Sequence, residues 1–305
     1  MSNSSNNNSK PILEGAEGFD AVAKQMLGPQ PAGIGKLGTI ELQLAYYRFK
    51  TKNNSHNQNN NQPIPEQMLI PLTRNAGMFP PTSDVAIKMA DELLKSLLHM
   101  TCLSPWWGIP QTLELYSILA RQATHISLQN LECFHSPDPT LRWTANLKPG
   151  TKVLVISPFS KTIQSQIPKL PQIWPNLWAP DLIFNTITCP LSYGVQDPDT
   201  QHFMRLKWTD SLGLLEDLKT QMDNTDYDVV LVGAGIYSLP LVAHAKQRGK
   251  RGIHLGGGTQ LFFGIRGGRW DEMKEFQPFF NEHWVRPAVE ERPANFQMVE
   301  RGCYW

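Results

Sequence analysis

Residues 226–270 read DYDVVLVGAGIYSLPLVAHAKQRGKRGIHLGGGTQLFFGIRGGRW and contain a complete strand–turn–helix–strand pattern. The run Val-Val-Leu-Val at 229–232 is short, apolar and β-branched, which is typical of a strand buried on both faces. Gly233 and Gly235 interrupt this run. The next segment, 238–248, has apolar residues at helical spacing and basic residues in its last turn, with a glycine just beyond, and this pattern predicts a helix.

The same stretch continues into a second strand at 253–255, which ends in three glycines at 256–258. A strand, a helix and a further strand in this order form a βαβ unit, and such units favour a parallel sheet. Ligands of parallel α/β sheets bind outside the carboxyl ends of the strands. Because both glycine turns fall at such ends, we expect the functional site there.

Three more apolar runs, at 152–157, 182–188 and 125–131, predict further strands. The run at 152–157 shows no alternation of apolar and polar residues, and neither does the strand at 228–233. We therefore expect these two strands to be covered on both faces and to lie parallel in one sheet. The alternation of strands with helices predicts an α/β protein with a mostly parallel, Rossmann-like sheet flanked by helices.

The N-terminal half of the chain is richer in helical patterns. Residues 83–101 give the clearest one, with the serine at its start expected as the N-cap, and a helical layer is expected at about 64–122. Residues 1–10 are rich in Asn and Ser and are expected to form a disordered tail. The Asn-rich residues 51–62 are expected to form a surface loop, within a single α/β domain that spans 11–305.

The composition excludes several classes of protein. The 305 residues are 41% hydrophobic and 18% charged, and the formal net charge of +1 gives no electrostatic reason to expect nucleic acid as a partner. The four cysteines form no CxxC pair, so reduced thiols are expected in place of disulfides or a zinc site. The polar N-terminus lacks the apolar core of a signal peptide, and the longest apolar stretch is interrupted by Gly and Pro. We expect a cytoplasmic protein with no integral membrane segment.

The motif Gly233-x-Gly235-x-x-Ser238 approximates the dinucleotide-binding fingerprint, and it lies between a strand and a helix as that fingerprint requires. The third glycine is a serine, however, and the next strand ends at His254 in place of the acid that would hold a ribose. Two interpretations stay open at this point. The turn either contacts a ligand or packs the sheet.

The run Gly256-Gly257-Gly258-Thr259 is a second candidate site. Three consecutive glycines at a strand end let backbone N–H groups approach an anion, and a helix that begins near Thr259 would direct its positive end toward the same place. This pattern favours a phosphate-binding turn over a merely flexible one. We call residues 256–259 the glycine turn.

Residues 35–41, with the sequence GKLGTIE, place a cation, a hydroxyl and a carboxylate around a strand-to-helix turn. Thr39 is a suitable N-cap for the helix that follows. Glu41 either holds a metal ion or simply interacts with the helix dipole. We expect Glu41 to lie within reach of the glycine turn, at one cleft.

Residues 281–286, with the sequence NEHWVR, bring hydrogen-bonding and titratable side chains together with a tryptophan. Arg286 would pair with a phosphate or carboxylate in a pocket, or with Glu290 or Glu291 in an internal ion-pair network. The aromatic residues of 279–305 predict that this tail packs back onto the domain. We expect it to bring residues 281–286 to the rim of the ligand cleft.

Three short segments, in the same order along the chain, resemble glycosyltransferases with the GT-D fold. The 35–41 turn and the leucine after it are similar to the R-F-G-D-G-E-L turn of that family, whose Asp-x-Glu motif is associated with a divalent metal and a nucleotide sugar. The sequence VISP at 155–158 is similar to the family's I-I-G-P strand end, and residues 231–256 to its late strand–G-P-x-A–helix–G-x-x-A-I-D-I-G-H stretch. Thr39, His254 and Gly257 depart from the family's Asp, Asp and His. The chain also resembles a group of proteins, without an assigned activity, that share H-L-G-G-x-T-Q and N-E-H-W…G-C-Y-W.

The resemblance implies a glycosyltransferase that moves a sugar from a nucleotide-sugar donor to a glycan or other acceptor. It implies Mn²⁺ or Mg²⁺ at Glu41, where Thr39 in place of the motif's Asp leaves a single carboxylate. Together with the residue patterns above, it predicts donor-binding residues at Gly35, Lys36, Gly38, Thr39, Ser157, Gly233, Gly235, Gly256, Gly257, Gly258, Thr259 and Arg286.

Glycosyl transfer requires that the charge of the diphosphate leaving group be neutralised and that the acceptor lose a proton. Lys36, the glycine turn and Arg266 or Arg286 are candidates for the first task, together with Glu41. Glu282 and His283 are candidates for the catalytic base. The alternatives are an NAD(P)-dependent oxidoreductase and a non-catalytic nucleotide-binding domain that derives from a glycosyltransferase-like fold. The sequence does not indicate an oligomeric state.

Overall fold

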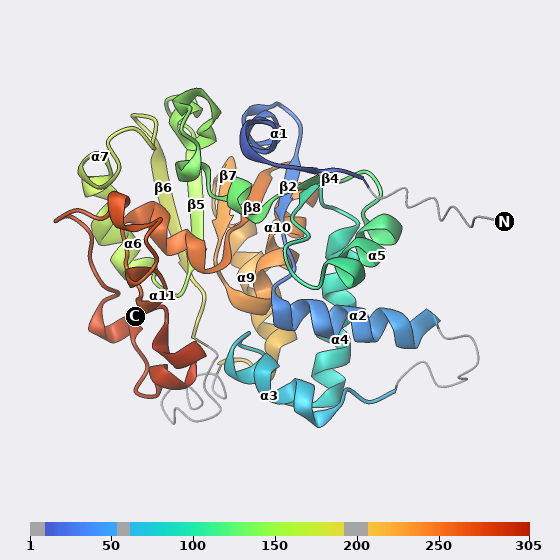
Figure 1. Cartoon of the computed structure of the whole chain (residues 1–305). Coiled ribbons are helices and arrows are strands. Elements are labelled where there is room, and N and C mark those ends of the chain that lie inside the picture. Colours follow the sequence, from blue (N-terminus) through green and yellow to red (C-terminus); the bar gives the residue numbers. More distant parts are fainter. Residues whose placement is uncertain (1–9, 54–61, 192–206) are drawn as a thin grey trace.

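A computed structural model describes residues 10–53, 62–191 and 207–305. In this part of the chain eight strands form one sheet in which every neighbouring pair is parallel, with helices on both faces (Figure 1). The predicted α/β class and parallel sheet are therefore confirmed. In spatial order the strands are β1 (Ile12–Leu13), β4 (Thr124–Ile126), β3 (Cys102–Leu103), β2 (Ala32–Gly35), β8 (Arg251–His254), β7 (Val229–Val232), β5 (Lys152–Ser157) and β6 (Ile183–Thr188).

Strands β5 and β7 pair in parallel at the centre of one half of the sheet, as their continuous apolar runs predict. Leu154 pairs with Val230, and both lie in a core cluster on one face of the sheet. Val155 pairs with Leu231, and both lie in the cluster on the other face. Because both faces are covered, these strands show no alternation of apolar and polar residues.

One face of the sheet is covered by a layer of longer helices, and most of the helical pattern expected at 64–122 lies in this layer. Thr82, and not Ser83, is the N-cap of the clearest helix, since its side-chain oxygen accepts a hydrogen bond from the N–H of Val85 at 3.4 Å. The helices of this layer are α2 (Thr39–Asn53), α3 (Glu66–Arg74), α4 (Ser83–Leu97), α5 (Ile109–Leu119), α9 (Ser211–Asp223) and α10 (Ser238–Gln247).

Two expected segments lie partly or wholly outside the described residues. Residues 51–53, expected in the Asn-rich loop, complete α2, while 54–61 are not described. Of the expected N-terminal tail, only Lys10 is described. The run at 125–131 is a strand only at its start, because β4 ends at Ile126 and a 3₁₀ turn follows.

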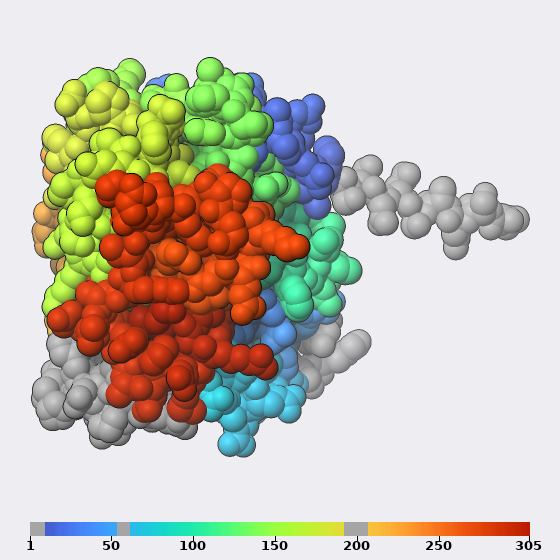
Figure 2. Space-filling view, turned by 60° about the vertical axis from the view of Figure 1, so that its left-hand side comes forward, coloured from blue at the N-terminus to red at the C-terminus, as the bar shows by residue number. Residues whose placement is uncertain are grey.

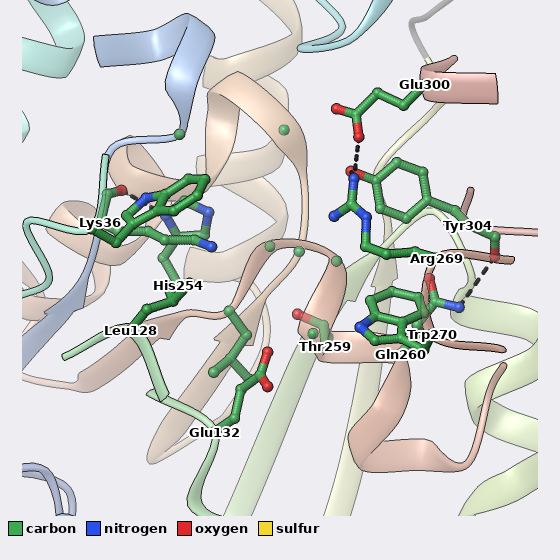
Figure 3. A pocket seen from close by; sticks show the side chains of 18 of the residues that line it. Lys36, Leu128, Glu132, His254, Thr259, Gln260, Arg269, Trp270, Glu300 and Tyr304 are labelled. Atoms are coloured by element: carbon green, nitrogen blue, oxygen red, sulfur yellow. Dashed lines mark hydrogen bonds and ion pairs between the residues drawn. The ribbon is translucent and has the colours of Figure 1, made fainter. Parts of the chain in front are cut away.

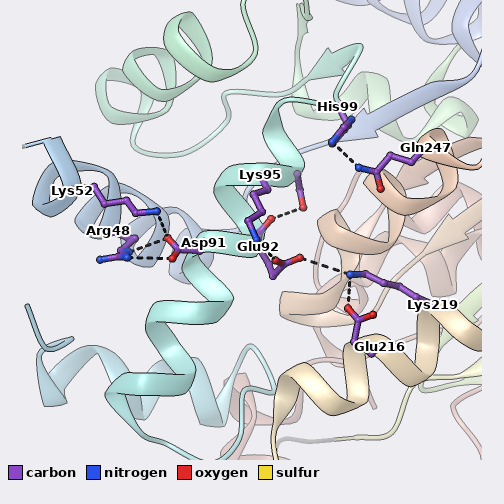
Figure 4. A network of polar contacts seen from close by, with 10 residues as sticks. Arg48, Lys52, Asp91, Glu92, Lys95, His99, Glu216, Lys219 and Gln247 are labelled. Carbon is purple, nitrogen blue, oxygen red and sulfur yellow. Dashed lines mark hydrogen bonds and ion pairs between the residues drawn. The ribbon is translucent and has the colours of Figure 1, made fainter. Parts of the chain in front are cut away.

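A network of polar contacts joins three helices of this layer (Figure 4). The guanidinium of Arg48 on α2 donates to both oxygens of Asp91 on α4, at 2.9 and 3.2 Å, and Lys52 also donates to Asp91 at 2.9 Å. Although burial of the Asp91 carboxyl opposes the shift, these hydrogen bonds lower its pKa. Glu92 on α4 lies 3.7 Å from Lys219 on α9. The network therefore fixes α2 and α9 against α4.

The other face is covered by shorter elements and by the C-terminal part of the chain, which spreads over one side of the molecule in red (Figure 2). The α-helices outside the first layer are α1 (Gly15–Leu27), α6 (Ser160–Gln166), α7 (Leu170–Ile173) and α11 (Gly268–Asp271). The 3₁₀ segments of the chain are η1 (Leu128–Leu131), η2 (Cys133–His135), η3 (Pro139–Leu141), η4 (Trp143–Asn146), η5 (Ile167–Lys169), η6 (Gly235–Tyr237), η7 (Gly256–Phe263), η8 (Gln277–Phe279), η9 (Val289–Glu291), η10 (Phe296–Met298) and η11 (Glu300–Gly302). None of the described helices is long and apolar enough to cross a membrane.

The tail at 279–305 packs back onto the domain, as its aromatic residues predict. Trp284 is buried against the second core cluster. The ring of Trp305 lies 5.8 Å from that of Phe159 and 5.7 Å from that of Phe296, measured between centroids. Aromatic burial of this kind removes roughly 150–250 Å² per residue from water, which is enough to hold a chain end in place.

The sheet has a topological switch point between β5 and β7. The connection after β5 leads outward to β6 by way of α6, whereas the connection after β7 leads to β8 by way of α10. Because α6 and α10 lie on opposite faces of the sheet, the two connections separate and leave a crevice at the carboxyl ends of β5 and β7. Ser157 and Gly233 stand at this crevice.

Candidate functional site

A pocket of about 710 Å³ opens at the carboxyl ends of the central strands (Figure 3). Its walls are residues that follow β2, β5, β7 and β8, together with residues from the C-terminal part of the chain. The volume lies within the range of roughly 300–1,000 Å³ that is typical of small-molecule sites. The pocket is the candidate site.

The structure brings most of the predicted donor-binding residues to this pocket, and it places Glu41 and the glycine turn in the same pocket, as expected. Gly35 is an exception, because it packs in the interior. A Cβ built on it would lie 3.0 Å from the Cβ of His254. The predicted residues that line the pocket are Lys36, Gly38, Thr39, Glu41, Ser157, Gly233, Gly235, Gly256, Gly257, Gly258 and Thr259.

Lys36 forms one wall of the pocket. Its ammonium lies 4.9 Å from the ring centre of Trp106, and the indole N–H of Trp106 donates to the carbonyl oxygen of Leu37 at 2.9 Å, which fixes the ring. Burial lowers the pKa of Lys36, while the carboxylates of Glu132 and Glu41 oppose that shift. A buried cation of this kind gains from any anion that enters the pocket.

His254 lies beside Lys36 in the same wall. Its Nδ1 is 3.0 Å from the carbonyl oxygen of Lys36, so Nδ1 carries the proton and donates to that oxygen. Burial, together with the charge of Lys36, lowers the pKa of His254 to about 3. The imidazole is therefore neutral, and its unprotonated Nε2 lies on the side of Gly256, 3.6 Å from the position of a Cβ on that residue.

The glycine turn forms the floor. It opens η7, and among the described residues the backbone N–H groups of Gly256 and Gly257 have no acceptor. Side chains would not fit here. A Cβ on Gly257 would lie 2.6 Å from the ring of Tyr304, and one on Gly258 would lie 2.1 Å from Oε1 of Glu132. Two unpaired N–H groups at a helix start form a suitable site for an anion.

Arg269 forms the opposite wall, and in Figure 3 the side chain of Thr259 lies between it and Lys36. The guanidinium forms an ion pair with Glu300 and lies 4.7 Å from the ring centre of Tyr304. Its Nη2 donates to the hydroxyl of Tyr304 at 3.3 Å. The C-terminal part of the chain therefore contributes a second cation to the pocket.

Two buried polar atoms at the floor have no hydrogen-bond partner within the described ranges. They are Oγ1 of Thr259 and Oε1 of Gln260, and both residues are only 1% exposed. Buried polar atoms are nearly always paired with protein or water. Both residues contribute to the pocket lining, but these two atoms are closed off from solvent and are not exposed to a ligand in the pocket.

Gly233 and Gly235 favour the packing interpretation of their motif. A Cβ on Gly233 would lie 2.5 Å from the carbonyl oxygen of Gly256 and 2.6 Å from Oγ1 of Thr259. One on Gly235 would lie 2.5 Å from the carbonyl oxygen of Ala76. The space above both glycines is thus occupied by the chain itself. In the dinucleotide fingerprint that space is left for a pyrophosphate.

Glu41 is the residue that the resemblance assigns to a divalent metal. Its carboxylate folds back against Gly38, and its own backbone N–H donates to it. Burial raises its pKa and favours the neutral form, while Lys36 opposes the shift. Within 10–53, 62–191 and 207–305 no three His, Cys, Asp or Glu side chains are arranged to hold a metal ion. A single carboxylate holds Mg²⁺ only together with other oxygen ligands such as substrate phosphates, so the metal expected at Glu41 stays a prediction.

Glu282, His283 and Arg286 are not among the residues that line the pocket. The side chain of Glu282 is 83% exposed, with one oxygen 3.6 Å from the imidazole of His283. Arg286 forms an ion pair with Asp271, and its guanidinium also donates to the backbone oxygen of Trp305 at 3.4 Å. The tail packs onto the domain as expected, but the side chains of Glu282, His283 and Arg286 lie outside the pocket lining.

Glu132, His135, Arg269 and Glu300 line the pocket, although the sequence patterns did not single them out. Glu132 lies between η1 and η2, and His135 is the last residue of η2; segments this short have no periodic pattern in the sequence. Arg269 directly follows Gly267 and Gly268, whereas Arg266 precedes them. This position after two glycines is the local difference that would have favoured Arg269 as the pocket residue. Arg266 is instead paired with Asp271 at 3.0 Å.

The chain was also compared with known proteins. No model of a protein family matches it, and searches of curated proteins and of solved structures gave no match either. The function of the pocket must therefore be inferred from its residues and their geometry.

Proposed function

We propose that the protein is a glycosyltransferase that binds a nucleotide-sugar donor in this pocket and transfers the sugar to a glycan or another acceptor. One observation carries the proposal. Lys36 and Arg269 come from opposite walls, and the unpaired N–H groups of Gly256 and Gly257 lie on the floor of the same pocket. Two cations and two N–H donors form a site for a diphosphate.

The chemistry of glycosyl transfer requires such a site. When the bond between the sugar and the diphosphate breaks, negative charge develops on the leaving oxygen. Fixed N–H dipoles and buried cations stabilise that charge without reorganisation. Lys36 is suited to this task because its buried ammonium gains stabilisation when an anion arrives. No step of this scheme requires a metal ion.

The remaining walls suit the other parts of a nucleotide sugar. Trp106, Trp270 and Tyr304 line the pocket and offer aromatic surface to a base or to the apolar face of a sugar ring. We also propose a cytoplasmic location, which the four free cysteines support.

A thermal-shift panel tests the proposal and its rivals. The probes are UDP, GDP, UDP-glucose, GDP-mannose, NAD⁺ and NADP⁺, each with and without Mn²⁺. We expect a nucleoside diphosphate or its sugar to raise the melting temperature without Mn²⁺, since a ligand at 100 times its Kd stabilises by about 2.7 kcal/mol. A shift with NAD⁺ or NADP⁺ alone would favour an oxidoreductase. Nucleotide binding without sugar release would indicate a non-catalytic domain.

Two arginines of the C-terminal part provide a matched pair of variants. Both are paired with a carboxylate, but Arg269 lines the pocket whereas Arg286 does not. Arg269→Ala removes a charge-assisted contact worth about 1.5–3 kcal/mol, so the Kd for the nucleotide should rise roughly 10- to 100-fold. Arg286→Ala should leave the Kd unchanged and lower stability by about 1 kcal/mol at most. Equal losses of affinity in the two variants would count against this site.

A further inference from the structure

Four glutamates line the pocket among the described residues, and they differ in what holds them. Glu41 accepts from its own backbone N–H, Glu300 is paired with Arg269, and Glu275 is exposed. Glu132 is different. One of its oxygens lies 3.3 Å from Nε2 of His135, and the other, Oε1, accepts no hydrogen bond from any described residue. It is a carboxylate held at one end with its other oxygen available.

His135 is well placed to hold that end. Its side chain is only 9% exposed, and its ring is enclosed by three aromatic rings, of Phe134, Phe276 and Phe279, with centroids at 4.6, 5.3 and 5.7 Å. Packing of this density restricts rotation of the imidazole. Its Nε2 therefore keeps a fixed direction toward Glu132.

The available oxygen of Glu132 lies against the glycine turn. A Cβ on Gly258 would lie 2.1 Å from Oε1, so the carboxylate occupies the space that a side chain would take there. In Figure 3 the carboxylate of Glu132 points up toward the floor of the pocket, beside Thr259. The same turn holds the diphosphate in the proposed function. Oε1 is thus next to the place where the bond between sugar and diphosphate would break.

We infer that Glu132 is the catalytic base of the transfer and that His135 is its positioning residue; this inference rests on the proposed function. The oxygen of the acceptor hydroxyl forms a bond to the anomeric carbon of the sugar. The bond from that carbon to the diphosphate oxygen breaks, and its electron pair stays on the diphosphate. The proton of the acceptor hydroxyl moves to Oε1 of Glu132, which becomes a neutral carboxylic acid. The nitrogen of His135 stays beside Oε2, from which it lies 3.3 Å.

The test compares Glu132→Gln with the wild type and with Glu282→Gln, a control that removes an exposed carboxylate outside the pocket. Turnover is measured as release of UDP from UDP-glucose, with water or a glycan as acceptor, and affinity as the Kd for UDP-glucose. A general base contributes about 10²- to 10⁴-fold to a rate. We expect a loss of kcat in this range for Glu132→Gln, with the Kd within about twofold of the wild type. Glu282→Gln should keep both values.

Three further measurements separate a base from a structural carboxylate. Formate should restore part of the rate in Glu132→Ala, because it supplies a carboxylate in the space left by the side chain. Gly258→Ala should also lower kcat, since its Cβ would displace Oε1 while Glu132 stays in the chain. His135→Gln should lower kcat by a smaller factor than Glu132→Gln, with the KM for the donor unchanged.

Different results would overturn the role of Glu132 and the proposed function. If Glu132→Gln turns over UDP-glucose within threefold of the wild type, Glu132 is not the base, although the proposed function stands. If kcat and the melting temperature fall, the Kd rises with them and formate restores nothing, Glu132 has a structural role. If the wild type neither binds nor turns over any nucleotide sugar of the panel, both the proposed function and this inference are wrong.

Discussion

Gly233→Ala is a substitution whose effect follows directly from the packing of the sheet against the glycine turn. Its Cβ would lie 2.5 Å from the carbonyl oxygen of Gly256 and 2.9 Å from the Cβ of Thr259, whereas ordinary contacts begin at 3.4 Å. The backbone of β7 and the turn would have to separate by about 0.9 Å, the difference between 3.4 and 2.5 Å. The group that must move is backbone, so the strain cannot be relieved by rotating a side chain.

The expected loss of stability can be worked out from that contact. Overpacking a core costs typically about 1–3 kcal/mol. Replacing glycine by alanine also reduces the entropy of the unfolded chain, which offsets about 0.4–1 kcal/mol. The net loss is then about 1–2 kcal/mol, or roughly 1.5–3 °C in melting temperature for a chain of 305 residues. Nucleotide affinity should fall as well, because the turn that carries the free N–H groups is displaced.

Differential scanning calorimetry, with Gly213→Ala as the control, measures this effect. Gly213 lies in the first turn of α9, and a Cβ there would make only ordinary contacts, at 3.7 Å or more. Alanine should therefore raise stability by about 0.5–1 kcal/mol at this position. If Gly233→Ala melts at or above the wild-type temperature and abolishes binding of NAD⁺, the packing argument is refuted and the dinucleotide interpretation is favoured.

Three more substitutions test the electrostatics of the fold, each by calorimetry across pH. Burial lowers the pKa of Lys36, so the unfolded chain binds the proton of its ammonium more tightly than the folded chain does. Lys36→Met should therefore raise the melting temperature at pH 7. The difference from the wild type should shrink as the pH approaches 10.5. Burial raises the pKa of Glu41, so the stability of the wild type falls as the pH rises above 4.5. Glu41→Gln should therefore melt at a higher temperature than the wild type at pH 7 but not at pH 4. The hydrogen bonds from Arg48 lower the pKa of Asp91 despite its burial. The ionised carboxylate therefore stabilises the fold above pH 3.8, and this stabilisation is lost as the pH falls through the pKa of the folded state. Asp91→Asn should cost about 2 kcal/mol at pH 7, and the difference should vanish in acid. The opposite pH trend in any of the three would contradict the corresponding shift.

The strands that carry the site were predictable because a strand buried on both faces consists of apolar residues only. β5 and β7 are covered on both faces, so each had to be apolar throughout, and the glycines after β7 predicted where the site lies. β1 and β3 have two residues each, and no periodicity exists over such a length. The N-cap at Thr82 instead of Ser83 reflects two suitable hydroxyl residues in a row, which only the backbone angles distinguish.

The pocket was predictable where it is formed by strand ends and not where it is formed by irregular segments. Lys36 and the glycine turn follow β2 and β8, so the rule for parallel sheets placed them together. Glu132 lies between two 3₁₀ segments and Arg269 lies in the four-residue helix α11, and the positions of both depend on long-range packing. Arg286 carries the same charge as Arg269, and its pairing with Asp271 is a tertiary contact that no local pattern reveals.

A crystal structure of the protein grown with UDP would test most directly whether a diphosphate lies on the glycine turn. We expect its oxygens within about 3 Å of the N–H groups of Gly256 and Gly257, and paired with the side chains of Lys36 and Arg269. The uridine would then lie against the aromatic wall of the same pocket. UDP bound elsewhere on the molecule, or in this pocket with its phosphates directed away from the turn and from both cations, would contradict the proposed function.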